Sequence, residues 1–290
     1  MNFGLHFPQA EIPHDFTIIR DYLQTGEARG FSHINVPDHV IQTRTPIADF
    51  PMAAVYTTDF PHHETMTLLA YAAGVTDSMK LKSAILILPQ RQAVLVAKQA
   101  AQIDVLSGGR MQLGVGIGWN DPEYDALNVS FKGRAARMEE QMEVLRKLWS
   151  EQHVTYKGKW HDINDAGLAP MPIQRPIPIW IGAFQPPAIA RAARIADGWQ
   201  AMLPAPGEQA AQVFEQFRNQ VTEAGRDPSQ VGIEATIFSP ERNEELWAQH
   251  IQGWIDCGAT QIVFRPQGDF KLIREMVDSF ASVMKDFVNS

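Results

Sequence analysis

Hydrophobic and polar positions along the chain follow two different periods. Short, nearly continuous apolar runs such as Lys80–Leu88 are typical of strands that are buried on both faces of a sheet. Longer stretches between them carry apolar residues three or four positions apart, which is the spacing of one helix face. The pattern predicts eight strands: Asn2–Phe7, Phe31–Val36, Lys80–Leu88, Met111–Gly116, Pro176–Ile181, Gly198–Leu203, Val231–Ile237 and Thr260–Phe264.

A predicted helix follows every predicted strand. These helices are His14–Arg29, Thr65–Val75, Ala93–Ser107, Arg134–Ser150, Pro187–Ile195, Glu208–Ala224, Asn243–Asp256 and Asp269–Val288. Strict alternation implies a parallel sheet with right-handed crossovers. Eight such units favour a closed (β/α)8 TIM barrel over the alternative of an open doubly wound sheet. We therefore expect residues 1–290 to form one domain, with long loops after strands two and four and a long stretch, Glu151–Arg175, before strand five.

Composition narrows the class of protein. Of the 290 residues 45% are hydrophobic, which excludes a disordered chain. The 25 Lys and Arg against 33 Asp and Glu give a net charge of −8, which argues against broad nucleic-acid binding. A single cysteine allows no internal disulfide, and no apolar run reaches the ~18 residues of a membrane helix. We expect a cytoplasmic protein without nucleic-acid or membrane partners.

Candidate chemistry lies where the predicted strands end, because barrels carry their active sites at the carboxyl ends of the strands. Asp38 and His39 follow strand two, and a histidine there can move a proton near neutral pH. A structural loop histidine is the simpler alternative. His6, at the end of strand one, together with His62-His63 raises the alternative of a metal site. The familiar metal-ligand spacings are absent, so we expect no metal.

Two glycine-containing strand ends suggest a ligand close to the backbone. Strand four ends in Gly114-Val115-Gly116-Ile117-Gly118-Trp119, which lacks the third glycine of the dinucleotide fingerprint. It suits a flat ligand or an anion, or it is merely a tight turn. Strand five runs through Gly182-Ala183-Phe184 into a helix, and a helix N-terminus favours a phosphate. An ordinary strand-to-helix turn is the alternative there.

With these residues in place, the chain resembles the bacterial luciferase-like family of flavin- or deazaflavin-dependent oxidoreductases. The matching stretches are Val36–His39, Ala97–Arg110, Leu113–Trp119, Pro176–Gly182 and Ala192–Trp199, with part of the helix 134–150. The resemblance implies a TIM barrel with a flavin-like ring in its mouth. A Pro-Asp-His segment combined with a Gly-x-Gly-Trp strand end is similar to the enzymes that use coenzyme F420.

The resemblance also implies roles for individual residues. Asp38 and His39 would lie beside the ring, with His39 as proton donor or acceptor. A non-prolyl cis peptide is implied at Ser83-Ala84. The cofactor-binding set would comprise His6, Ser83, Ala84, Gly116, Gly118, Trp119, Asn120, Gly182, Ala183 and Phe184.

The chain also departs from its relatives. Ala183 stands where many of them have a second glycine, and Trp119 stands where the glucose-6-phosphate dehydrogenases have a catalytic glutamate. The anionic tail of the cofactor would favour nearby basic residues, for which Arg44, Arg91 and Arg265 are candidates.

The function expected from all this is hydride transfer between coenzyme F420 and a small organic substrate. The alternatives are an FMN-dependent monooxygenase that uses oxygen, a cofactor-binding barrel without catalysis and, last, a metal-dependent hydrolase. The substrate pocket is expected from the loops Ile41–Glu64, Gln152–Pro172 and Leu203–Glu208, with the apolar side chains Phe50, Met52, Tyr56, Phe60 and Trp160. The resemblance also implies a homodimer.

Overall fold

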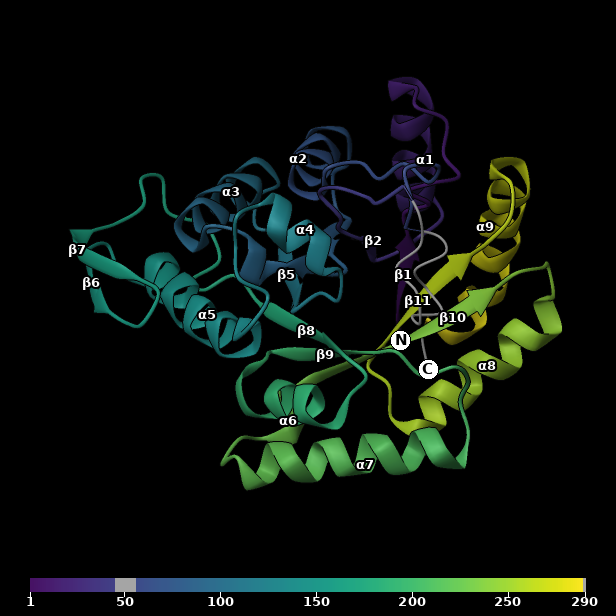
Figure 1. Cartoon of the computed structure of the whole chain (residues 1–290). Coiled ribbons are helices and arrows are strands. Elements are labelled where there is room, and N and C mark those ends of the chain that lie inside the picture. Colours follow the sequence, from purple (N-terminus) through teal and green to yellow (C-terminus); the bar gives the residue numbers. More distant parts are fainter. Residues whose placement is uncertain (45–55, 289–290) are drawn as a thin grey trace.

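A closed parallel barrel forms the centre of the molecule (Figure 1). The computed structural model describes residues 1–44 and 56–288. The barrel strands in chain order are β1 (Asn2–His6), β2 (His33–Val36), β3 (Lys80–Ser83) continued by β4 (Leu86–Ile87), β5 (Met111–Gly116), β8 (Ile179–Ala183), β9 (Gly198–Ala201), β10 (Gly232–Ser239) and β11 (Gln261–Pro266). Each strand pairs with its neighbours in parallel, and the pairs β1–β11 and β3–β5 close the ring. The predicted (β/α)8 fold is confirmed.

Helices connect consecutive strands and surround the barrel (Figure 1). They are α1 (Phe16–Ala28), α2 (Thr65–Val75), α3 (Ala93–Leu106), α5 (Arg134–Ser150), α6 (Pro186–Ile195), α7 (Glu208–Glu223), α8 (Glu244–Cys257) and α9 (Phe270–Met284). Side-chain caps fix several N-termini, for example Asp269, which accepts from the Leu272 amide. In the described part of the chain no helix has both the length and the apolarity that crossing a membrane requires.

Two segments that the hydrophobic pattern left as loops are folded. Strands β6 (Val154–Lys157) and β7 (Asp162–Ala166) form an antiparallel hairpin between α5 and β8. The Glu140 side chain on α5 accepts hydrogen bonds from the amides of Lys159, Trp160 and His161 and so attaches this hairpin to the barrel. The short helix α4 (Asp121–Ala126) lies in the loop after β5.

The third predicted strand is broken, and the break corrects one expectation. The cis peptide joins Ala84 to Ile85, so its placement at Ser83-Ala84 was wrong by one residue. Ser83 still pairs with Val36 on β2, and its Oγ donates to the Gly114 carbonyl at 2.8 Å, so the strand ladder ends only after it.

Candidate functional site

A cavity of about 340 Å³ opens at the carboxyl ends of the barrel strands. It lies at the end of the barrel where (β/α)8 enzymes carry their sites. Ten of the twelve residues expected from the sequence line it: His6, Asp38, His39, Ala84, Gly116, Gly118, Trp119, Gly182, Ala183 and Phe184. Ser83 and Asn120 are buried and do not line it.

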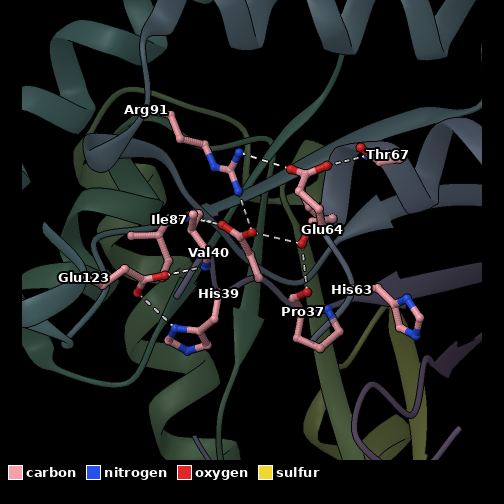
Figure 2. Close-up of polar contacts among 12 residues, drawn as sticks. Pro37, His39, Val40, His63, Glu64, Thr67, Ile87, Arg91 and Glu123 are labelled. Atoms are coloured by element: carbon pink, nitrogen blue, oxygen red, sulfur yellow. Dashed lines mark hydrogen bonds and ion pairs between the residues drawn. The ribbon is translucent and has the colours of Figure 1, made fainter. Parts of the chain in front are cut away.

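His39 is held by a carboxylate that the sequence reasoning missed. Its Nδ1 lies 3.0 Å from Oε2 of Glu123, and both side chains are buried (Figure 2). The other carboxylate oxygen accepts from the amides of Val40 and Ile41. Burial works to raise the pKa of Glu123, but the bonds from His39 and these amides lower it below the usual range. An ionised Glu123 assigns the proton to Nδ1 and leaves Nε2 for a ligand.

Aromatic side chains surround His39. The ring centroids of Tyr56 and Trp119 lie 4.4 and 5.7 Å from that of His39, and His62 lies at 5.6 Å. Burial lowers the pKa of His62 to about 4, so His62 is neutral at pH 7. Tyr56 and Trp119 line the cavity and give its mouth an aromatic wall, which suits a flat ligand.

Asp38 faces the protein rather than the ligand. Its carboxylate accepts from Arg91 at 2.7 Å, from Thr65 Oγ1 at 3.0 Å and from the Ile87 amide at 3.0 Å (Figure 2). Arg91 also contacts Glu64 at 3.2 Å. Burial raises the pKa of Asp38 despite Arg91. The Asp38 side chain therefore ties the end of β2 to β4 and α2 and positions His39, its neighbour in the chain.

Ile85 explains two of the glycines. A Cβ atom at Gly116 or at Gly182 would lie only 2.6 Å from the Ile85 side chain. Ordinary carbon contacts are about 3.5–4.0 Å, so any side chain at these positions displaces Ile85. The glycines at the ends of β5 and β8 therefore make room for the residue after the cis peptide, and all three residues line the cavity.

The expected phosphate site at the end of β8 has few backbone donors but a nearby arginine. Pro186 and Pro187 begin α6 and offer no N–H groups, which weakens the helix N-terminus as an anion site. A cation lies near the neighbouring strand β5. Arg134, the first residue of α5, lines the cavity, donates to the Gly118 carbonyl at 3.3 Å and lies over the Phe131 ring. Arg134 was not expected from the sequence.

The cavity floor is polar. Glu234 on β10 accepts from Lys82 at 2.7 Å, from Asn35 at 2.8 Å and from Gln200 at 3.1 Å, and its other partner His33 lies at 3.0 Å. Burial alone would raise the pKa of Glu234, but Lys82 and His33 hold it far below the usual range. The amide oxygens Oδ1 of Asn35 and Oε1 of Gln200 are buried without a hydrogen-bond donor. The floor thus offers acceptors to a ligand that carries N–H or O–H groups.

Other expected residues have different places. Of the three candidate arginines, Arg265 lines the cavity, Arg91 is ion-paired away from it, and Arg44 is not among the lining residues. Within the described ranges, no three His, Cys, Asp or Glu side chains lie close enough to hold a metal ion.

The loops expected to build the substrate pocket contribute unevenly. Phe50 and Met52 lie outside the described residues. Tyr56 lines the main cavity, and Phe60 lines a smaller one beside it. Trp160 packs near Arg137 and Lys159 and does not line the cavity.

A family model described as luciferase-like monooxygenase matches residues 2–277. The chain belongs to this family. An uncharacterized protein of Mycobacterium tuberculosis, Rv0940c, is 34% identical over 199 residues, which cover 67% of this chain and 68% of that protein. The FMNH2-dependent dimethylsulfone monooxygenase of Pseudomonas putida is 34% identical over 139 residues, 47% of this chain and 38% of the relative.

A solved structure shows the same fold over the whole chain. The coenzyme F420-dependent tetrahydromethanopterin reductase from Methanopyrus kandleri has a TM-score of 0.77, with 18% identity and 99% of both chains covered. The resemblance drawn from the sequence motifs is thus confirmed at the level of the family and the fold. Membership of this family supports an oxidoreductase of the flavin or deazaflavin type.

Proposed function

We propose that this chain binds coenzyme F420 in the barrel mouth and transfers a hydride between it and a small organic substrate. His39 donates or accepts the accompanying proton. The observation that carries the proposal is the His39–Glu123 pair, in which the carboxylate holds Nδ1 at 3.0 Å. None of the described residues hydrogen-bonds Nε2. An imidazole fixed through one nitrogen is arranged to move a proton through the other.

The cavity residues fit a flat ring with an anionic tail. Ile85 and Trp119 offer apolar surface to a ring, and the Gly118 strand end brings Arg134 to a place where a phosphate would be neutralised. When bound, the deazaflavin supplies or accepts the hydride. The chain orients the ring, excludes water and holds a proton at His39. The two prolines of α6 leave fewer backbone donors, so Arg134 carries more of the phosphate binding.

An FMN-dependent monooxygenase is the second candidate. The relative from Pseudomonas putida is named for FMNH2, whereas the neighbour from Methanopyrus kandleri is named for coenzyme F420. Both cofactors present a similar ring and a phosphate, so the same lining residues suit either. The Pro-Asp-His and Gly-x-Gly-Trp segments together lead us to favour coenzyme F420.

Direct titration separates the two cofactors. The purified chain is mixed with coenzyme F420 or FMN, oxidised and reduced, and binding is followed by quenching of the tryptophan fluorescence, to which Trp119 in the mouth contributes. We expect saturable quenching with coenzyme F420 and weaker binding of FMN. Tight FMN binding without coenzyme F420 binding would overturn the choice of cofactor.

The role of His39 is tested by His39→Ala. We expect cofactor affinity to stay nearly unchanged and turnover to fall by about 10²–10⁴, the usual contribution of a general acid or base. Turnover is measured on the best substrate from a panel of alcohols, carbonyl compounds and activated alkenes. His153→Ala is the matched control, since the His153 side chain is 67% exposed. Unchanged turnover of His39→Ala would remove His39 from the mechanism.

A further inference from the structure

Arg265 is a cation at the mouth of the barrel that has no ion-pair partner among the described residues. It stands at the carboxyl end of β11, is half-buried, and lies over the Phe238 ring at 5.4 Å. Neither a hydrogen bond nor an ion pair joins its guanidinium to any described residue. The other arginines of this region are engaged: Arg91 binds Asp38 and Glu64, and Arg134 donates to backbone carbonyls. A half-buried guanidinium without an acceptor favours an anionic ligand.

A second, smaller cavity of about 90 Å³ meets the main one at Arg265. His6, Pro37 and Tyr56 also line both cavities, so the two are adjacent. The smaller cavity extends between the loops after β1 and β11, and its far wall includes Gln9, Phe60 and His62. Its volume suits a small group rather than a second ring.

The charges around the smaller cavity favour a singly charged oxyanion. Burial, then Arg265 and His62, lower the pKa of His6 well below its usual value, while Glu234 opposes them. His6 and His62 are therefore neutral near pH 7. The single N–H of His62 is on Nδ1 and donates to the Phe60 carbonyl at 3.0 Å, so of the two only His6 has a hydrogen bond to donate to a ligand. Glu11 also lines the cavity and repels a doubly charged group more strongly than a singly charged one. A carboxylate satisfies these conditions better than a phosphate does.

The barrel topology separates this place from the expected cofactor phosphate. Around the ring of strands, β11 lies opposite β5, with β8, β9 and β10 on one side and β1, β2 and β3 on the other. Arg134 donates to the carbonyl of Gly118, just after β5, and Gly182–Phe184 end the adjacent strand β8. A phosphate bound there leaves Arg265 on the far side of the mouth.

We propose that Arg265 anchors a carboxylate group of the organic substrate, with the carboxylate in the smaller cavity and the reacting part of the substrate in the main one. The inference rests on the proposed function, because it assumes that the cofactor occupies the β5–β8 side. It narrows the substrate class to small organic acids. It also assigns Arg265 to the substrate, whereas the sequence made it a candidate for the cofactor tail.

Isosteric probes test the charge requirement. Benzoate and its neutral isostere benzamide are titrated into the cofactor-free protein by calorimetry, and phenyl phosphate is titrated in parallel. We expect benzoate to bind at least about tenfold more tightly than benzamide, as one charge-assisted hydrogen bond implies. Equal affinities, no saturable benzoate binding, or tighter binding of phenyl phosphate than of benzoate would overturn the proposal.

Variants tie the effect to Arg265. Arg265→Gln should abolish the preference for benzoate, and Arg265→Lys should keep part of it, because a lysine retains the charge without the planar fork. Arg274→Gln, at an exposed arginine of α9, should behave like the wild type. If Arg265→Gln keeps the preference for benzoate, the carboxylate binds elsewhere and the proposal fails.

The cofactor titration keeps the two proposals distinguishable. Arg265→Gln should bind coenzyme F420 as the wild type does, and loss of that binding would show that Arg265 serves the cofactor, which contradicts the inference. If the wild type binds neither coenzyme F420 nor FMN but binds benzoate through Arg265, the proposed function fails while the carboxylate site stands.

Discussion

The two sides of the barrel mouth differ in whether their charged groups are paired with other described residues. On the side of β2 and β4, Asp38 binds Arg91, which also contacts Glu64, and His39 binds Glu123 (Figure 2). On the side of β1 and β11, Arg265 has neither a hydrogen bond nor an ion pair with a described residue, and His6 is half-buried with its pKa lowered.

We infer that the paired charges have a structural role and that the unpaired ones have a role in ligand binding. Paired charges fix geometry, because each buried partner is satisfied only in one arrangement. Unpaired polar groups keep their capacity for a ligand, at some expense in stability. The contacts on the β2 side thus hold the imidazole of His39 in position before a ligand binds. On the β11 side, Arg265 is available to bind an anionic group of the ligand.

The largest expected effect is on turnover in Glu123→Gln. The amide keeps the shape of Glu123 but no longer stabilises a charged His39 or fixes the proton on Nδ1, so we expect turnover to fall by about 10²-fold or more. The pH dependence of turnover should also change, since the ionised Glu123 carboxylate that contacts Nδ1 of His39 is gone. Steady-state kinetics across pH, with the free energy of unfolding as control, makes the measurement.

A purely structural role of Glu123 predicts something else. In that case the variant would lose stability and cofactor affinity, while the shape of its pH profile would stay that of the wild type. Glu123→Asp should recover part of the lost turnover if the carboxylate is what matters. Glu143→Gln is a matched control, because Glu143 lies on α5 with an exposed bond to Tyr156.

The next largest effect is on the free energy of unfolding, which should fall more for a variant on the β2 side than for one on the β11 side. Asp38→Ala removes one acceptor each from Arg91, Thr65 and the Ile87 amide, and breaking such a buried pair costs about 3 kcal/mol. Arg265→Gln removes the contact with the Phe238 ring but no hydrogen bond or ion pair with a described residue, and it should change the free energy of unfolding by less than about 0.5 kcal/mol. Urea unfolding measures both, and equal losses in the two variants would remove the distinction between paired and unpaired sides.

The smallest expected effect is the pH dependence carried by His62. Burial lowers its pKa to about 4 in the folded state, while an unfolded histidine titrates near ~6.5. Between these values the unfolded chain binds more protons, so the contribution of His62 is complete above about pH 6.5 and is lost as the pH falls towards 4.

His62→Gln isolates this contribution. Going from pH 7.5 to pH 5, the wild type should lose about 1–2 kcal/mol more of its free energy of unfolding than the variant. Urea unfolding at the two pH values gives the comparison. Identical losses would mean that His62 is already protonated, or fully solvated, in the folded protein.

The fold could be predicted from the sequence because hydrophobic residues repeat with the regular periods of strands and helices, and the order of these elements matched a barrel. The break in the third strand after Ser83 could not be predicted, because the apolar run Lys80–Leu88 continues through it. For the site, position at a strand end identified His39, since the barrel brings all such ends together. Glu123 and Arg134 lie on helices, and nothing in their local sequence shows that they reach the mouth; only the folded loop after β5 places them there.

The same limit explains the arginines. Arg91 and Arg265 both follow or end strands at the mouth, and by position they looked equivalent as partners of an anionic tail. They differ in the residues that the fold places beside them. Asp38, which follows β2, forms an ion pair with Arg91, while no described residue forms an ion pair with Arg265.

A crystal structure of the chain soaked with coenzyme F420 would show where the cofactor lies in the barrel mouth. We expect the deazaflavin ring beside His39, the phosphate on the β5–β8 side near Arg134, and no contact between Arg265 and the cofactor. A ring bound away from His39, or a phosphate held by Arg265, would contradict this expectation.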